Sequence, residues 1–258
     1  MKIKFEKYES GGNDFVLIDN RNNLYDLDSD KIKKICNRNF GIGSDGLIIL
    51  KKSKIADFKM VYFNSDGQSS SLCGNGTRCL FSFSLSLGII KKIAKIETSE
   101  GIYIATISNR NLVSLKMKDI DDILLFDNKA CLNSGSPHHV EMIEDLNKIS
   151  VKNMGSSIRF SRRYSPHGTN VNFFKKINDK KFEIRTYERG VEDETLSCGT
   201  GATAVAIAVH AMGLTTQSEI IIQTKGGELI ISFETSATGY KNICLEGPTR
   251  FVFKGEYQ

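Results

Sequence analysis

Residues 196–212 read LSCGTGATAVAIAVHAM, in which Cys198 and a Gly-Thr-Gly turn precede an alanine-rich apolar run. Residues 72–87 read LCGNGTRCLFSFSLSL, where Cys73 precedes Gly-Asn-Gly and a second apolar run. The two cysteines are 125 residues apart, and glycines recur at the same offset, pairing Gly43 with Gly168, Gly88 with Gly213 and Gly101 with Gly226. A pattern that recurs at a fixed offset indicates an internal duplication.

Each apolar run is flanked by short strand-like segments. Residues 80–87, LFSFSLSL, alternate with period two, which is typical of a strand. The partner run is rich in alanine and closed by Gly213, which is typical of a helix and its C-terminal cap. We predict a helix for both runs, because a segment that is apolar or small on every face suits a helix enclosed by a sheet. The predicted fold class is α/β in the α+β sense: two pseudo-symmetric domains, each a mostly antiparallel sheet wrapped around a central helix.

Length and composition favour a globular protein of two domains. The chain has 258 residues, of which 40% are apolar and 25% charged. We predict an N-terminal domain of residues 1–118 plus 249–258, carrying Cys73, and a C-terminal domain of residues 119–248, carrying Cys198.

Partners and location are constrained by what the sequence lacks. No secretory signal and no run of about 18 apolar residues is present, so we expect a cytoplasmic protein without a membrane partner. The net charge of +5 is spread over short lysine pairs, which argues against a nucleic-acid surface. The sequence leaves the oligomeric state open, with a homodimer among the alternatives.

Three other site types fit the residues less well. Residues 41–46, GIGSDG, match a dinucleotide-binding pattern, but a helical pattern precedes them and a strand-like one follows, so we predict a turn. The histidines and cysteines lack HExxH and CxxC spacing, so no metal site is expected. A cysteine hydrolase would pair His138 with Cys73 and leave Cys198 without a role.

A cysteine at the start of a helix suits acid–base chemistry. Unpaired N–H groups and the helix dipole favour a thiolate there, and the following glycines leave backbone N–H groups free to hold a carboxylate. If the two halves face each other, two thiols reach one cleft. Such symmetry suits inversion of a stereocentre next to a carboxylate, in which one thiolate removes the α-proton and the other thiol delivers one to the opposite face.

The chain resembles the diaminopimelate epimerase family. The resemblance is carried by FNSDGQSSSLCGNGTRC at residues 63–79 and by RTYERGVEDETLSCGTGA at residues 185–202, and it extends over nearly the whole chain. It implies an isomerase of two similar domains that interconverts LL- and meso-2,6-diaminopimelate, in lysine and peptidoglycan-precursor biosynthesis. It also implies that neither pyridoxal phosphate nor any other cofactor is used.

The resemblance further implies the roles of single residues. Cys73 and Cys198 become the acid/base pair. The proximal carboxylate would be bound by the backbone of Gly74, Asn75, Gly199 and Thr200, and the amines and distal carboxylate by Asn13, Asn64, Asn170, Glu188 and Arg189. His138 and Glu188 would adjust the protonation of Cys73 and Cys198 respectively. The sequence departs from the family pattern at Ser136, where asparagine is common, at Gly46, where some members have glutamine, and at Ser10, where glycine is common.

Two rival functions remain open. A proline or hydroxyproline racemase of the same fold would resemble MCGHG around the first cysteine, whereas Asn75 stands there, and would leave Arg189 without a distal carboxylate to bind. A catalytically silent binding module would keep the glycine turns and lose a cysteine, and both cysteines are present.

Overall fold

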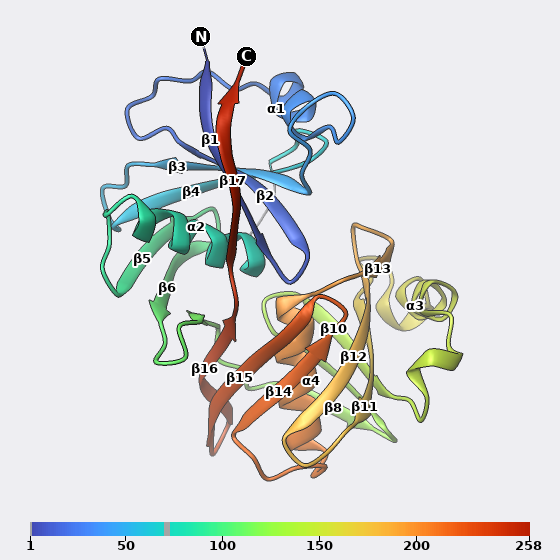
Figure 1. Ribbon diagram of the computed structural model, residues 1–258. Helices are drawn as coiled ribbons and strands as arrows, with labels where there is room; N and C mark the ends of the chain where they lie inside the picture. The colour runs from blue at the N-terminus through green and yellow to red at the C-terminus, as the bar shows by residue number, and fades with distance from the viewer. Residues whose placement is uncertain (1, 70–72) are drawn as a thin grey trace. The chain divides into compact units, whose positions relative to one another are not determined.

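The chain divides into two compact units in the computed structural model, which describes residues 2–69 and 73–258 (Figure 1). Unit 1 comprises Met1–Leu115 and Gly247–Gln258, and unit 2 comprises Lys116–Glu246. Unit 1 therefore contains both ends of the chain, and the last strand of the chain pairs with the first strand in its sheet.

The sheet of unit 1 runs in the order β17-β1-β2-β3-β4-β5-β6-β7. Neighbouring strands are antiparallel except for the parallel pairs β2/β3 and β4/β5. The strands are β1 (Ile3–Ser10), β2 (Asn13–Asp19), β3 (Gly46–Lys51), β4 (Phe58–Asn64), β5 (Ile93–Thr98), β6 (Gly101–Ile107), β7 (Val113–Lys116) and β17 (Arg250–Tyr257).

The sheet of unit 2 has the same plan, in the order β8-β9-β10-β11-β12-β14-β15-β16. Its parallel pairs, β10/β11 and β12/β14, occupy the positions of β2/β3 and β4/β5. The strands are β8 (Ile123–Phe126), β9 (Lys129–Asn133), β10 (Pro137–Met142), β11 (Asn170–Lys176), β12 (Lys181–Glu188), β13 (Asp193–Thr195, paired with β12), β14 (Glu219–Thr224), β15 (Gly227–Ser236) and β16 (Gly239–Gly247). The matching order confirms the duplication and the predicted fold class.

One buried helix lies against each sheet, α2 (Gly74–Ser86) in unit 1 and α4 (Gly199–Ala211) in unit 2 (Figure 1). Helix α4 contacts strands on both sides of its sheet's centre, from β9 to β15, and its residues 201–209 are all buried. Helix α2 shows that the period-two pattern of its second half was misleading, because Leu80, Phe81 and Phe83 are all buried on a helix. The prediction of a helix for both runs is confirmed.

Shorter helices cover other parts of the two units. Helix α1 (Ser29–Cys36) packs Ile32 and Ile35 against alternate residues of β2 and β3, such as Val16 and Leu47. Helix α3 (Val151–Arg159) lies in the equivalent place in unit 2, where Val151 packs with Val171 and Phe173, and the 3-10 turns η1 (Leu146–Lys148) and η2 (Arg162–Tyr164) flank it. Residues 41–45 form bends and irregular backbone, and strand β3 begins at Gly46, so the helix that a dinucleotide-binding GxGxxG motif would open does not follow the match.

One detail of the predicted repeat is wrong by a residue. Gly101 has φ +123 and begins β6, and the residue with the same role in unit 2 is Gly227, with φ +126 at the start of β15. Gly226, the partner expected from a constant offset, precedes the hairpin strand. One residue has therefore been inserted between α4 and β15 relative to unit 1.

Glycine after each buried helix is a conformational requirement. Gly88 and Gly213 have φ +70 and +72, and nothing lies within 4 Å of a Cβ built on either.

The change Gly213→Ala therefore adds no clash and forces only the left-handed conformation on alanine, which costs an L-residue about 1–2 kcal/mol. We expect a fall of that size in the free energy of unfolding, measured by urea denaturation. Gly213→Asn, the control, should lose less because asparagine tolerates this conformation, and equal stability of Gly213→Ala and wild type would contradict the assignment.

Candidate active site

The two cysteines cap the two buried helices. Cys73 (φ −108, ψ 113) and Cys198 (φ −121, ψ 112) are the N-cap residues of α2 and α4. Each Sγ accepts a hydrogen bond from the N–H three residues later, at 3.5 Å from Gly76 and 3.4 Å from Gly201. Both sulfurs thus occupy the place where an N-cap serine or asparagine oxygen usually lies, at the positive end of a helix dipole that favours a thiolate.

In unit 1, Asn13 lies at the start of β2, with its side chain between the carboxylate of Asp45 and the first turn of α2. Its Nδ2 donates to Asp45 Oδ2 at 2.7 Å, and Asp45 also accepts from Arg38 at 2.7 Å. The Oδ1 atom of Asn13 therefore lies toward Cys73 Sγ, at 3.6 Å, and toward Asn75 Nδ2, at 3.4 Å. The structure brings the predicted residues Asn13, Cys73 and Asn75 together.

Arg78 lies beneath this group and was not predicted as a site residue. Its side chain is fully buried on α2, and its Nη2 donates to Asn75 Oδ1 at 2.5 Å and to Ser10 Oγ at 2.9 Å. Ser10 in turn donates to the carbonyl of Pro248 at 2.8 Å, which gives this departure from the family pattern a structural role. Burial lowers the pKa of Arg78. The signal in the sequence was a single charged residue within an apolar run.

The two remaining unit 1 positions lie at the same end of the sheet. Asn64 ends β4, is exposed, and pairs with Gly46 in β3, whose neighbour β2 begins at Asn13. A Cβ at Gly46 would lie 2.6 Å from the Tyr62 ring and 2.7 Å from the Phe63 carbonyl. The packing of Tyr62 therefore excludes a glutamine at position 46 in this conformation.

In unit 2, several predicted residues are linked by hydrogen bonds around Ser136. Its Oγ lies 3.0 Å from His138 Nε2, 3.0 Å from Asn170 Nδ2 and 3.4 Å from Thr200 Oγ1. Thr200 Oγ1 is also 3.5 Å from Cys198 Sγ. These contacts connect the starts of β10 and β11 to the first turn of α4.

His138 is held in a neutral form. Its ring is 1% exposed, and burial, together with the positive charge of Arg189, lowers its pKa to about 3. Its Nδ1 lies 3.0 Å from Asn172 Nδ2, which also donates to the carbonyl of His139 at 3.0 Å. Asn172 was not predicted, although it alternates with Asn170 on β11 and so shares its face.

Glu188 is the last residue of β12, and Arg189 follows it. The backbone N–H of Arg189 donates to Asn170 Oδ1 at 2.8 Å, and its guanidinium donates to the carbonyl of His167 at 3.3 Å. Glu188 is half-buried, and burial raises its pKa. A cation and a carboxyl group therefore lie at the same sheet end as Asn170.

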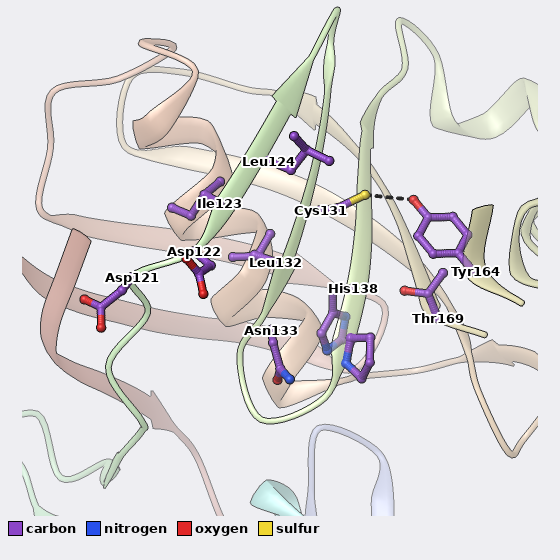
Figure 2. Close-up of a pocket in the computed structure, with 11 residues that line it drawn as sticks. Asp121, Asp122, Ile123, Leu124, Cys131, Leu132, Asn133, His138, Tyr164 and Thr169 are labelled. Carbon is purple, nitrogen blue, oxygen red and sulfur yellow. Dashed lines mark hydrogen bonds between the residues drawn. The ribbon is translucent and has the colours of Figure 1, made fainter. Parts of the chain in front are cut away.

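A surface cavity of about 560 Å³ lies beside this region of unit 2 and is lined by neither Cys73 nor Cys198 (Figure 2). His138 is the predicted site residue that lines it. Figure 2 shows Cys131 pointing toward Tyr164, with Sγ 2.8 Å from the hydroxyl, which also lies 2.7 Å from His139 Nδ1. The predicted acid/base residues are therefore placed by the helix N-caps and not by this cavity.

Residues 2–69 and 73–258 contain no group of three or more histidine, cysteine and acidic side chains arranged to hold a metal ion. Within the same ranges, no helix has the length and apolar character needed to cross a membrane.

Solved structures of other proteins share this fold along nearly the whole chain. A PhzF-family phenazine biosynthesis protein of Bacillus anthracis superimposes with a TM-score of 0.80 at 14% identity, covering 100% of this chain and 99% of the other. A probable proline racemase of Agrobacterium radiobacter superimposes with a TM-score of 0.70 at 13% identity, covering 99% and 93%. At these identities the likeness establishes the fold alone.

Sequence similarity defines the family. The diaminopimelate epimerase family profile matches residues 5–120 and 130–252. The diaminopimelate epimerase of Flavobacterium psychrophilum is 48% identical over 253 residues, which cover 98% of this chain and 99% of that protein. That of Aquifex aeolicus is 36% identical over 273 residues, covering 98% and 97%. The chain belongs to the diaminopimelate epimerase family.

The neutral form of His138 gives a testable pH dependence. Because its pKa is lowered to about 3, the ring should stay uncharged in the folded protein from pH 8 down to pH 5. In the unfolded chain the ring binds a proton near its ordinary pKa of about 6.5, so the folded state should lose stability as the pH falls from there toward 3. We expect NMR of ring-labelled histidine to show no His138 titration between pH 8 and 5. A midpoint within that range would contradict the burial argument, and His138→Gln assigns the resonance.

Proposed function

We propose that the protein interconverts LL-2,6-diaminopimelate and meso-2,6-diaminopimelate without a cofactor. The observation that carries the proposal is the presence, in a member of this family, of a cysteine at the N-cap of each of the two duplicated helices. The relatives named diaminopimelate epimerase support the substrate. Production of the meso form serves lysine and peptidoglycan-precursor biosynthesis.

The proposed mechanism uses Cys73 and Cys198 as base and acid in alternate directions. One thiolate removes the α-proton, and the other thiol delivers a proton to the opposite face of the same carbon. The carbanion-like transition state is stabilised through its carboxylate by backbone N–H groups of Gly74, Asn75, Gly199 and Thr200. In this scheme His138, neutral at working pH, acts through hydrogen bonds and not through charge.

Exchange of the α-proton with solvent tests the reaction type. In deuterated water, with LL-diaminopimelate and no pyridoxal phosphate, we expect meso product labelled at the inverted α-carbon, detected by mass spectrometry and NMR. The base removes a protium and the opposing thiol returns a deuteron, so unlabelled meso product would contradict proton transfer. Cys73→Ala and Cys198→Ala should each lower kcat by at least about 10³-fold, since each removes one of the two proton carriers, whereas Cys244→Ala should not.

Recognition of the distal carboxylate separates this function from a monocarboxylate racemase. We propose that Asn13, Asn64, Asn170, Glu188 and Arg189 hold the amines and the distal carboxylate, with Arg189 forming paired hydrogen bonds to the latter. Arg189→Met should raise KM for diaminopimelate by about 10- to 100-fold, in line with the loss of a charge-assisted bond. Arg163→Met, which changes an exposed arginine on η2, is the matched control. Equal KM values for the two variants, or faster turnover of proline than of diaminopimelate, would favour the rival function.

We further propose a cytoplasmic location and the domain division at residues 118/119 and 248/249. A homodimer is the assembly state to test, and light scattering coupled to size-exclusion chromatography measures it directly.

A further inference from the structure

The hydrogen bonds around Ser136 have a direction, because each backbone carbonyl in the group can only accept. Asn172 Nδ2 donates to the carbonyl of His139, which identifies that atom as the amide nitrogen. The same nitrogen lies 3.0 Å from His138 Nδ1, so His138 Nδ1 must be the unprotonated ring atom. Since the ring is neutral, its single proton lies on Nε2 and is donated to Ser136 Oγ at 3.0 Å.

Asn170 supplies a second donor to the same hydroxyl. Its Nδ2 donates to the carbonyl of Pro137 at 3.0 Å, and its Oδ1 accepts from the backbone N–H of Arg189 at 2.8 Å. The orientation of the amide is therefore determined twice, and Nδ2 is also 3.0 Å from Ser136 Oγ. Ser136 Oγ accepts from both His138 and Asn170, which uses both lone pairs of a hydroxyl oxygen.

With both lone pairs occupied, Ser136 can only donate to its remaining neighbour. That neighbour is Thr200 Oγ1, at 3.4 Å. Thr200 cannot return a proton to Ser136, so its own O–H is directed at Cys198 Sγ, 3.5 Å away. The oxygen–oxygen distance is long, as is common for hydrogen bonds in active sites before substrate binds, whereas 3.5 Å is an ordinary distance to the larger sulfur atom.

We propose that His138, Ser136 and Thr200 form a hydroxyl relay that directs the Thr200 proton at Cys198 Sγ and favours the thiolate form of Cys198. Together with the N–H of Gly201, it provides two donors to one sulfur. Hydrogen bonds to the charged form of a group lower its pKa. Ser136 and Thr200 are positioning residues in this relay. Ser136 can take part because a hydroxyl oxygen, unlike either polar atom of an asparagine amide, can accept two hydrogen bonds and also donate one.

The corresponding neighbour in unit 1 has the opposite polarity. Asn13 donates its Nδ2 protons toward Asp45, so the atom it presents to Cys73 Sγ is the acceptor Oδ1. An acceptor at 3.6 Å favours the protonated thiol of Cys73. The two contacts therefore favour a resting enzyme with the proton on Cys73 and the charge on Cys198, the arrangement that a two-base reaction needs before its first step. The catalytic meaning of this difference rests on the proposed function.

Three titratable groups lie near the relay, and a substitution at Thr200 leaves all of them in place. At this end of unit 2, β10 carries His138, β12 ends at Glu188, and Arg189 follows directly after β12. His138 is neutral, and Glu188 and Arg189 carry opposite charges when both are ionised. None of the three is changed by a substitution at Thr200, so a shift measured there reports the hydroxyl.

The test is the pH dependence of alkylation of Cys198. Iodoacetamide reacts with the thiolate, and peptide mass spectrometry gives the rate at Cys198 separately from the other cysteines. A Cys73→Ala background removes coupling between the two thiols. In that background we expect Thr200→Val to raise the midpoint of the Cys198 profile by about one pH unit, corresponding to loss of one hydrogen bond to a charged group. Ser136→Ala should shift it in the same direction by less, and Thr200→Ser should restore the original midpoint.

Thr203→Val is the matched control. Thr203 is buried on the same helix, and its hydroxyl donates to the carbonyl of Gly199 and not to sulfur, so this change should leave the midpoint unaltered. Equal midpoints for Thr200→Val and Thr203→Val, with no shift in Ser136→Ala, would overturn the relay. Alkylation needs no turnover, so a protein that fails to epimerise diaminopimelate and still shows the shifts would refute the proposed function and leave the relay standing.

Discussion

A sulfur atom at the start of an enclosed helix is the constraint on which the site depends. Helix α4 is buried along residues 201–209, so those side chains can bind nothing from solvent and the reactive end of the helix is its N-terminus. The first-turn N–H groups of any helix lack partners within the helix. The Sγ atom of Cys198 accepts from one of these groups, the N–H of Gly201. The N–H groups of Gly199 and Thr200 lie in the same first turn, so a thiol and amides that can bind an anion lie together at the N-terminus of α4. Cys73 and α2 repeat the arrangement in unit 1.

The two copies of this arrangement have diverged in the groups behind them. Behind Cys73 lie charged residues, with Arg78 bound to Asn75 and with Asp45 bound to Asn13. The groups linked in series to Cys198 are the hydroxyls of Thr200 and Ser136, the amide of Asn170 and the neutral imidazole of His138. Thr203 stands on α4 where the repeat offset would place a counterpart of Arg78, and its hydroxyl binds its own helix. A duplicated scaffold with different supporting groups can hold two chemically identical thiols in different protonation states.

Much of this could be predicted from local patterns. The cysteine turns, the all-apolar run of α4 and the caps at Gly88 and Gly213 are features of contiguous sequence, and they predicted both helices and the sheet around each. Features that depend on distant residues could not be predicted. In the sequence Arg78 is only an interruption of an apolar run, and the structure shows that it donates a hydrogen bond to the distant Ser10. Asn172 is likewise only a strand residue in the sequence, and the structure shows that it contacts His138 and His139.

Glycine at the third residue after each cysteine links the sulfur to these distant groups. A Cβ on Gly201 would lie 2.4 Å from Asn172 Oδ1 and 3.3 Å from Cys198 Sγ, and one on Gly76 would lie 2.8 Å from Ile48 Cδ1. These glycines donate to sulfur, but every residue except proline has an N–H, so donation alone does not select them. Close packing does select glycine at position 201, because a Cβ there would collide with Asn172 Oδ1 and displace the amide that binds His138. Glycine at position 201 therefore leaves room for the Asn172 amide that orients His138, the first member of the relay to Cys198.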